Sequence, residues 1–135
     1  MIESLTMIID CISDLHGFQP KLPGGDLLIV AGDMTARDRS TEWTEFYDWL
    51  LDQPYRKIIM IAGNHDGVLT HVISTEELRT LPVEDIDMTP DNFEYLRDNY
   101  CIFEGLKIYG MPWTPTFCDW YFMQDRQGMR EMVNY

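Results

Sequence analysis

The sequence has 135 residues, of which 45% are hydrophobic, and a formal net charge of −13 at pH 7. This length and hydrophobic content suit one globular domain with its own core. The acidic charge argues against nonspecific binding to nucleic acids or anionic membranes, because its field repels polyanions. The first residues lack the basic region of a signal peptide, and the apolar runs are far shorter than a membrane span. We therefore expect a cytoplasmic protein.

Three segments combine an apolar run with a polar end. They are 6–17 (TMIIDCISDLHG), 26–35 (DLLIVAGDMT) and 57–66 (KIIMIAGNHD). Continuous apolar runs of this length, rich in Ile and Val and bounded by turn residues, are typical of strands buried on both faces. The three segments therefore predict three buried strands.

The segment 40–54 predicts an amphipathic helix between the second and third strands. Its apolar residues recur at helical spacing, and Pro54 ends the pattern. These residues are Trp43, Phe46, Tyr47, Leu50 and Leu51. Strand, helix and strand in succession predict a right-handed crossover and a parallel pair of strands.

The rest of the chain predicts smaller elements. We expect short helices at 74–81 and 89–99, and a last helix from about Gln124. The segment 100–110 predicts a tight hairpin with its turn at 104–105.

Polar side chains follow each of the three predicted strands. They are Asp14 and His16 after the first strand, Asp33 after the second, and Asn64, His65 and Asp66 after the third. Ligands of parallel α/β sheets bind outside the carboxyl ends of the strands. An Asp-x-His pair on an extended backbone directs both side chains to one side, and mixed oxygen and nitrogen donors suit Mn²⁺, Fe, Zn²⁺ or Ni²⁺. Each motif alone is common and usually structural, but three at successive strand ends favour a metal site.

The motifs "DLHG", "GDMT" and "GNHD" resemble the first three motifs of the calcineurin-like metallophosphoesterases. The later segment "GLKIYGMPWTPTFCDWYF" resembles the small metallophosphoesterase-domain-containing branch of that family. The likeness extends from about Ile8 to Phe122. It implies an α/β fold that is the N-terminal part of an αββα sandwich, with a mostly parallel sheet, crossover helices and one partial domain over residues 1–135.

The resemblance also implies metal-dependent hydrolysis of a phosphoester by in-line attack between two cations. It assigns Asp14 and His16 to the first metal, Asp33 to both metals, and Asn64 to the second. Mn²⁺ is the expected ion, with Fe, Zn²⁺ or Ni²⁺ as alternatives. A small phosphoester is the implied partner, and a cyclic nucleotide is one candidate.

By the same resemblance, Asn64 and His65 contact the substrate. His65 would face the phosphate and protonate the leaving oxygen, and Asp66 would orient His65. Arg37 can reach a phosphate, although a flexible loop residue is the simpler interpretation. Trp113 can line the rim of the site, with packing on the core as an equal alternative. Three further aromatic residues are interpreted as core: Trp120, Tyr121 and Phe122.

The family pattern continues with a further metal-binding His and a Gly-His-x-His motif, whereas the histidines of this sequence are His16, His65 and His71. The chain is therefore expected to hold at most one ion well, to be poorly active, and to self-associate through an open sheet edge or face. His71 is interpreted as a solvated loop residue. The alternative function is a non-catalytic binding or scaffold module with a partial metal site, and a nuclease is disfavoured by the charge.

Overall fold

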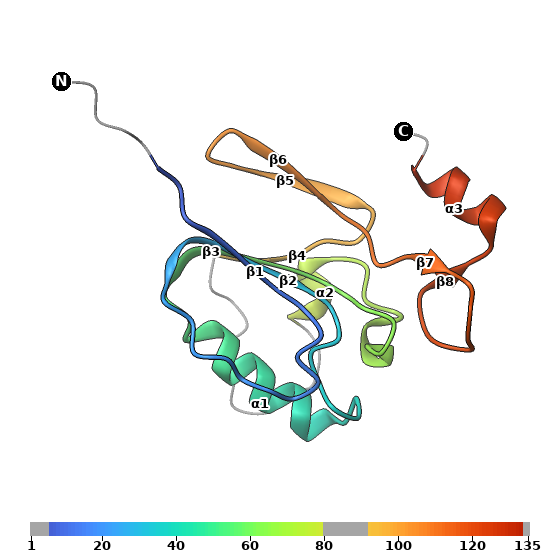
Figure 1. The fold of residues 1–135 in the computed structure, drawn as a ribbon, viewed down its shortest axis with the longest axis horizontal. Coiled ribbons are helices and arrows are strands. Elements are labelled where there is room, and N and C mark those ends of the chain that lie inside the picture. The colour runs from blue at the N-terminus through green and yellow to red at the C-terminus, as the bar shows by residue number, and fades with distance from the viewer. Residues whose placement is uncertain (1–5, 80–91, 134–135) are drawn as a thin grey trace.

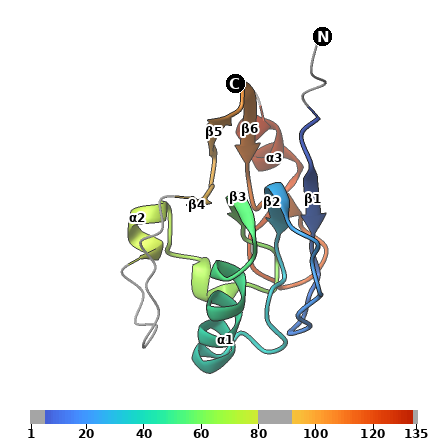
Figure 2. The same cartoon turned by 90° about the vertical axis from the view of Figure 1, so that its left-hand side faces the viewer.

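A four-stranded parallel sheet forms the centre of the computed structural model, which describes residues 6–79 and 92–133 (Figure 1). The strands follow one another across the sheet in chain order, as Figure 2 shows. They are β1 (Ile9–Ile12), β2 (Gly25–Ala31), β3 (Tyr55–Ile61) and β4 (Phe93–Tyr95). The predicted α/β class and parallel sheet are confirmed.

The other described elements are short and surround this sheet. The helical elements are α1 (Ser40–Leu51), a 3₁₀ turn (Gly67–Leu69), α2 (Thr75–Leu78) and α3 (Arg126–Val133). The remaining strands are the antiparallel hairpin of β5 (Asn99–Phe103) and β6 (Leu106–Gly110), and the parallel pair of β7 (Thr114–Pro115) and β8 (Met123–Gln124). The helix predicted within 40–54, the hairpin and the last helix are confirmed. Of the helix predicted at 74–81, the part beyond Arg79 lies outside the described residues.

The strands β2 and β3 are the buried centre of the sheet, as predicted. Figure 1 shows α1 on one face of the sheet and the β5–β6 hairpin on the other. Alternate side chains along each strand point to opposite faces, so each strand contributes to both layers. The α1 side receives Leu28, Val30, Ile58 and Met60, and the hairpin side receives Leu27 and Ile59.

The strand β1 differs from the prediction of burial on both faces. Its Ile9 is 40% exposed, and Cys11 is also exposed. Within the described residues β1 pairs with β2 alone, and the apolar side chains of the hairpin pack over β2 and β3. An apolar run at the edge of a sheet loses one neighbour on each face, so the run by itself overstates its burial.

The helix predicted at 89–99 is wrong for the residues that the structure describes, because 93–95 form the strand β4. Phe93 and Tyr95 are buried, whereas Glu94 between them is half-buried and accepts a hydrogen bond from the Lys57 ammonium at 2.9 Å. This alternation has the period of a strand. Pairing with β3 in parallel register places both aromatic rings in the core beside α1, and this tertiary gain overrides the local helical pattern.

The ends of β2 and β3 are held together by the buried carboxylate of Asp66. It accepts hydrogen bonds from the main-chain N–H groups of Gly63 (2.6 Å), Asp33 (2.8 Å) and Met34 (3.3 Å). Burial raises the pKa of Asp66 to about 6, against the lowering effect of these three hydrogen bonds. With a pKa of about 6 the group is mostly ionised at pH 7, and in that form its hydrogen bonds are charge-assisted.

The same two strand ends approach each other closely at two glycines. Gly32 has a φ of +93°, and a Cβ on it would lie 2.6 Å from the main-chain N and Cα of Gly63. Only a residue without a side chain allows both this backbone conformation and this approach.

We expect Asp66→Asn to lower the free energy of unfolding by about 1–3 kcal/mol, because the amide would place a donor against main-chain N–H groups that need acceptors. Urea denaturation measures the change. The matched control is Asp48→Asn, an exposed carboxylate on α1, with an expected change within about 0.5 kcal/mol. Equal losses in the two variants would contradict the linking role of Asp66.

Two alanine variants distinguish the stability cost of the close contact at Gly32 from the cost of a left-handed backbone conformation. Gly105, in the hairpin turn, has a φ of +80°, and a Cβ there would meet no atom within 4 Å. Gly105→Ala is therefore expected to cost about 1–2 kcal/mol for the left-handed conformation alone. Gly32→Ala should cost clearly more or prevent folding, as measured by thermal unfolding and soluble yield. A Gly32→Ala protein as stable as Gly105→Ala would show that the strand ends can separate.

Candidate metal centre

Three side chains from two strand ends converge on one point. Asp14, His16 and Asp33 each offer one ligand atom, and these atoms lie within 4.8 Å of one another. Asp33 is buried, whereas Asp14 and His16 are exposed. Main-chain hydrogen bonds join the two loops, from Asp14 N–H to the Gly32 carbonyl and from His16 N–H to the Asp33 carbonyl, both at 3.0 Å. The loops after β1 and β2 therefore hold the three donors together through the backbone.

The backbone at these donors differs from the extended conformation expected of the Asp-x-His pair. The strand β1 ends at Ile12, and the φ angles of Asp14, His16 and Asp33 are +54°, +46° and +58°. Such left-handed residues are uncommon outside glycine, although Asp and His tolerate them, and they concentrate at functional sites. The side chains thus converge because the loop turns at each donor.

The donor set fits a divalent cation. The Oδ1 atom of Asp14 lies 3.9 Å from Nε2 of His16, while its Oδ2 atom accepts a hydrogen bond from the Ser13 hydroxyl at 2.7 Å. In Asp33, Oδ1 accepts a hydrogen bond from the main-chain N–H of His65 at 3.0 Å, and this bond fixes the orientation of the carboxylate. Two oriented carboxylates and an imidazole are donors that borderline transition ions accept.

The loop after β3 brings His65 and Asn64 beside these donors. The exposed His65 ring lies 5.3 Å from the His16 ring, centroid to centroid, in an edge-on arrangement. Asn64 is half-buried, and its main-chain carbonyl accepts a hydrogen bond from the Tyr121 N–H at 3.1 Å. All three predicted polar clusters therefore lie at the carboxyl end of the sheet, as expected for parallel strands.

Asp66 lies behind this site and does not contact His65 in the way that the resemblance implied. Within the described part of the chain, its hydrogen bonds go to main-chain amides instead of the imidazole. One of these amides belongs to Asp33, whose carboxylate in turn accepts from the His65 N–H. Asp66 is therefore linked to the main chain of His65 through Asp33.

The two weaker candidates for substrate contact have other surroundings. Arg37 is exposed in the loop before α1, and its main-chain N–H donates to the Glu42 carboxylate at 3.0 Å. Trp113 is half-buried against the Phe122 ring, and its indole N–H donates to the Asp98 carboxylate at 2.9 Å. Trp113 therefore packs against the core, which is one of the two alternatives given for it.

Trp120, interpreted from the sequence as a core residue, lies beside the site instead. Trp120 is 43% exposed, and its ring lies 4.6 Å from the His65 ring. The core interpretation is also wrong for Tyr121, which is 49% exposed, and is confirmed for the buried Phe122. The signal in the sequence is a dense aromatic cluster around the polar Asp119, which lacks the alternation of a buried strand.

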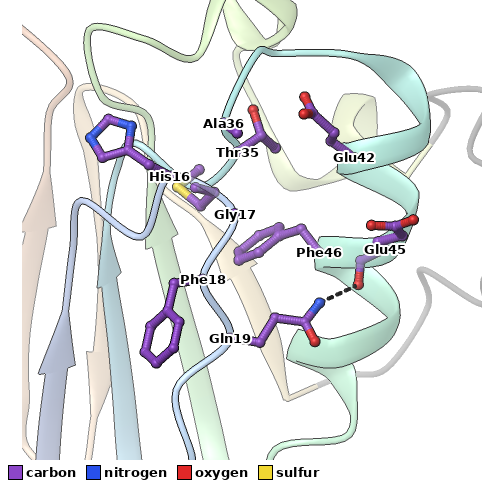
Figure 3. Close-up of a pocket in the computed structure, with 10 residues that line it drawn as sticks. His16, Gly17, Phe18, Gln19, Thr35, Ala36, Glu42, Glu45 and Phe46 are labelled. Carbon is purple, nitrogen blue, oxygen red and sulfur yellow. Dashed lines mark hydrogen bonds between the residues drawn. The ribbon is translucent and has the colours of Figure 1, made fainter.

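A pocket of about 270 Å³ adjoins the other side of the site (Figure 3). It lies between α1 and residues 16–19 of the loop after β1, and the Gln19 amide donates to the main-chain carbonyl of Glu45 across it. Its lining includes Phe18, Glu42 and Glu45. Two carboxylates make it unfavourable for a phosphate.

Across the described residues, no helix combines the length and apolar character needed to cross a membrane.

Comparison with known proteins agrees with this geometry. The sequence model of the calcineurin-like phosphoesterase family matches residues 7–127. Human metallophosphoesterase domain-containing protein 1 is 33% identical over 140 aligned residues, which cover 92% of this chain and 43% of that protein. A UPF0046 protein of Caenorhabditis elegans is 36% identical over 76% of this chain and 40% of its own length.

A third relative shows that the matching segment also occurs within much longer proteins. A protein named probable rhamnogalacturonate lyase C, from Emericella nidulans, is 34% identical over 84% of this chain but only 11% of its own length. The chain spans less than half the length of the curated relatives described above. The family match covers all three strand ends, and the chain belongs to the calcineurin-like phosphoesterase family.

Proposed function

We propose that this chain carries part of a metal-dependent phosphoester hydrolase site at the carboxyl ends of β1, β2 and β3. The observation that carries the proposal is the convergence of Asp14, His16 and Asp33 within 4.8 Å, with the exposed His65 beside them. Membership of a phosphoesterase family supports the reaction class. The acidic net charge supports a small ester over a nucleic acid.

Each residue has a part in this proposal. Asp14 and His16 would hold one cation, and the Asp33 carboxylate would contribute both to it and to a second one. Asn64 would offer its side-chain oxygen to a second cation. When bound, such cations supply Lewis-acid stabilisation of charge on the phosphoryl oxygens. His65 would donate a ring N–H to the phosphate and transfer that proton to the leaving oxygen.

We also propose which ion and which class of ester this donor set takes. Mn²⁺ suits two carboxylates and one imidazole, as do Fe and Zn²⁺. Among the described residues, the carboxylate, imidazole and thiol groups form one cluster of this kind, so we expect the 135-residue chain to hold one ion well. We propose a small phosphodiester as the substrate, with a cyclic nucleotide as one candidate, and slow turnover by the chain alone.

Two of the three histidines provide a matched test of metal binding. His16→Asn should weaken Mn²⁺ binding by at least about 10-fold, since it removes a ligand. His71→Asn, in an exposed loop, should leave the Mn²⁺ affinity unchanged. Isothermal titration calorimetry gives affinity and stoichiometry. Equal Mn²⁺ affinities for wild type, His16→Asn and His71→Asn would refute the metal centre.

Replacing His65 should separate catalysis from metal binding. His65→Asn is expected to lower kcat for an aryl phosphodiester in Mn²⁺ buffer by about 10²–10⁴-fold, because it removes the proton donor. Its Mn²⁺ affinity should stay at the wild-type value. If the wild-type protein binds Mn²⁺ but releases product no faster than His65→Asn does, the alternative of a non-catalytic binding module is favoured.

A further inference from the structure

We propose that Trp120 and Phe117 form an aromatic platform that binds a flat ring of the substrate, so that the preferred phosphoesters carry an aryl or nucleobase group. The inference rests on the proposed function, because the phosphate must lie at the metal centre. The platform is defined by these two residues of the loop between β7 and β8.

A continuous series of rings leads from the metal donors to this loop. The His16 and His65 centroids are 5.3 Å apart, those of His65 and Trp120 are 4.6 Å apart, and those of Trp120 and Phe117 are 5.0 Å apart. A phosphate beside His16 and His65 would therefore have its organic group next to Trp120. Tilted and edge-on rings at these separations are favourable aromatic contacts.

The platform loop is held in place by its own main chain. Thr114 N–H donates to the Phe122 carbonyl at 3.0 Å, and Tyr121 N–H donates to the Asn64 carbonyl at 3.1 Å. The Tyr121 ring packs against Gly67 so closely that a Cβ on this glycine would overlap it. The loop is therefore tied to the segment that carries Asn64 and His65, and Trp120 keeps its place beside the site.

Exposure of the platform rings indicates a ligand surface. Phe117 is 64% exposed and Trp120 is 43% exposed, whereas Phe122, at the end of the same loop, is buried in the core. Large exposed aromatic side chains grouped beside a polar site mark places where an apolar ligand surface binds. A flat ring fits because it can stack on an aromatic face whatever its hydrogen-bonding pattern.

The pocket on the other side of His16 is the competing place for the organic group. It contains one exposed aromatic ring, Phe18, but also the carboxylates of Glu42 and Glu45. These charges favour a cationic group over a neutral ring. The loop that carries the platform contains one carboxylate, that of the exposed Asp119, against two in the lining of the pocket.

The test compares two phosphates that differ only in the base. Dissociation constants of AMP and ribose 5-phosphate are measured by calorimetry for the full 135-residue chain with Mn²⁺. Wild type should bind AMP more tightly than ribose 5-phosphate by on the order of 10-fold, the value of one stacked base.

Trp120→Leu should bring this ratio of affinities close to one while the affinities for Mn²⁺ and ribose 5-phosphate stay unchanged. Trp120→Phe should keep most of the preference for AMP. Phe117→Leu, at the more exposed position, should reduce the ratio and serves if Trp120→Leu does not fold.

Phe18→Leu is the matched control, because Phe18 is an exposed ring on the opposite side of His16. It should keep the wild-type ratio. A ratio that survives Trp120→Leu, or that Phe18→Leu abolishes, overturns the platform. Equal binding of both phosphates by wild type overturns the platform alone, provided that Asp33→Asn abolishes that binding. If neither phosphate binds in a Mn²⁺-dependent manner, the proposed function fails together with the platform.

Discussion

The arrangement of the site depends on one buried carboxylate, that of Asp66, between the ends of two neighbouring strands. Strands that end side by side leave main-chain N–H groups without partners, and a buried N–H group without an acceptor is unfavourable. Asp66 accepts from three of them, on Gly63, Asp33 and Met34. It thereby stabilises the turn after β3 and the turn after β2 at once, at the place where their glycines touch. Without it, these three N–H groups would lose their acceptor beside the direct hydrogen bond between His65 and Asp33.

From this link the site extends outward by main-chain contacts. The Asp33 carboxylate accepts from the His65 N–H, the His16 N–H donates to the Asp33 carbonyl, and the Asn64 carbonyl accepts from the Tyr121 N–H. Four loops are thus joined largely through backbone groups. The imidazoles of His16 and His65 consequently remain exposed and available to a ligand.

The distribution of charge and aromatic groups around the donors gives the site two different sides. Toward α1 lies the pocket with Glu42 and Glu45, and toward β7 and β8 lie the rings of Trp120 and Phe117. A phosphate bound at the donors would therefore direct a neutral, flat substituent to the second side. The difference between the two sides depends on which loop lies on each side of the donors. Relatives that share the three motifs but have a different loop between β7 and β8 would therefore differ in substrate preference.

Local patterns in the sequence determined the central strands, the helix α1, the β5–β6 hairpin and the grouping of Asp14, His16, Asp33, Asn64 and His65 at one end of the sheet. These follow from the sequence because apolar runs, helical spacing and turn residues act over a few neighbours, and parallel strands align their carboxyl ends. Only the tertiary structure decided the strand at 93–95, the exposure of β1, the main-chain partners of Asp66 and the position of Trp120 in place of Trp113 beside His65. Each of these depends on groups far away in the sequence: pairing with β3 outweighs helical propensity, and buried amides attract a carboxylate more strongly than an exposed imidazole does.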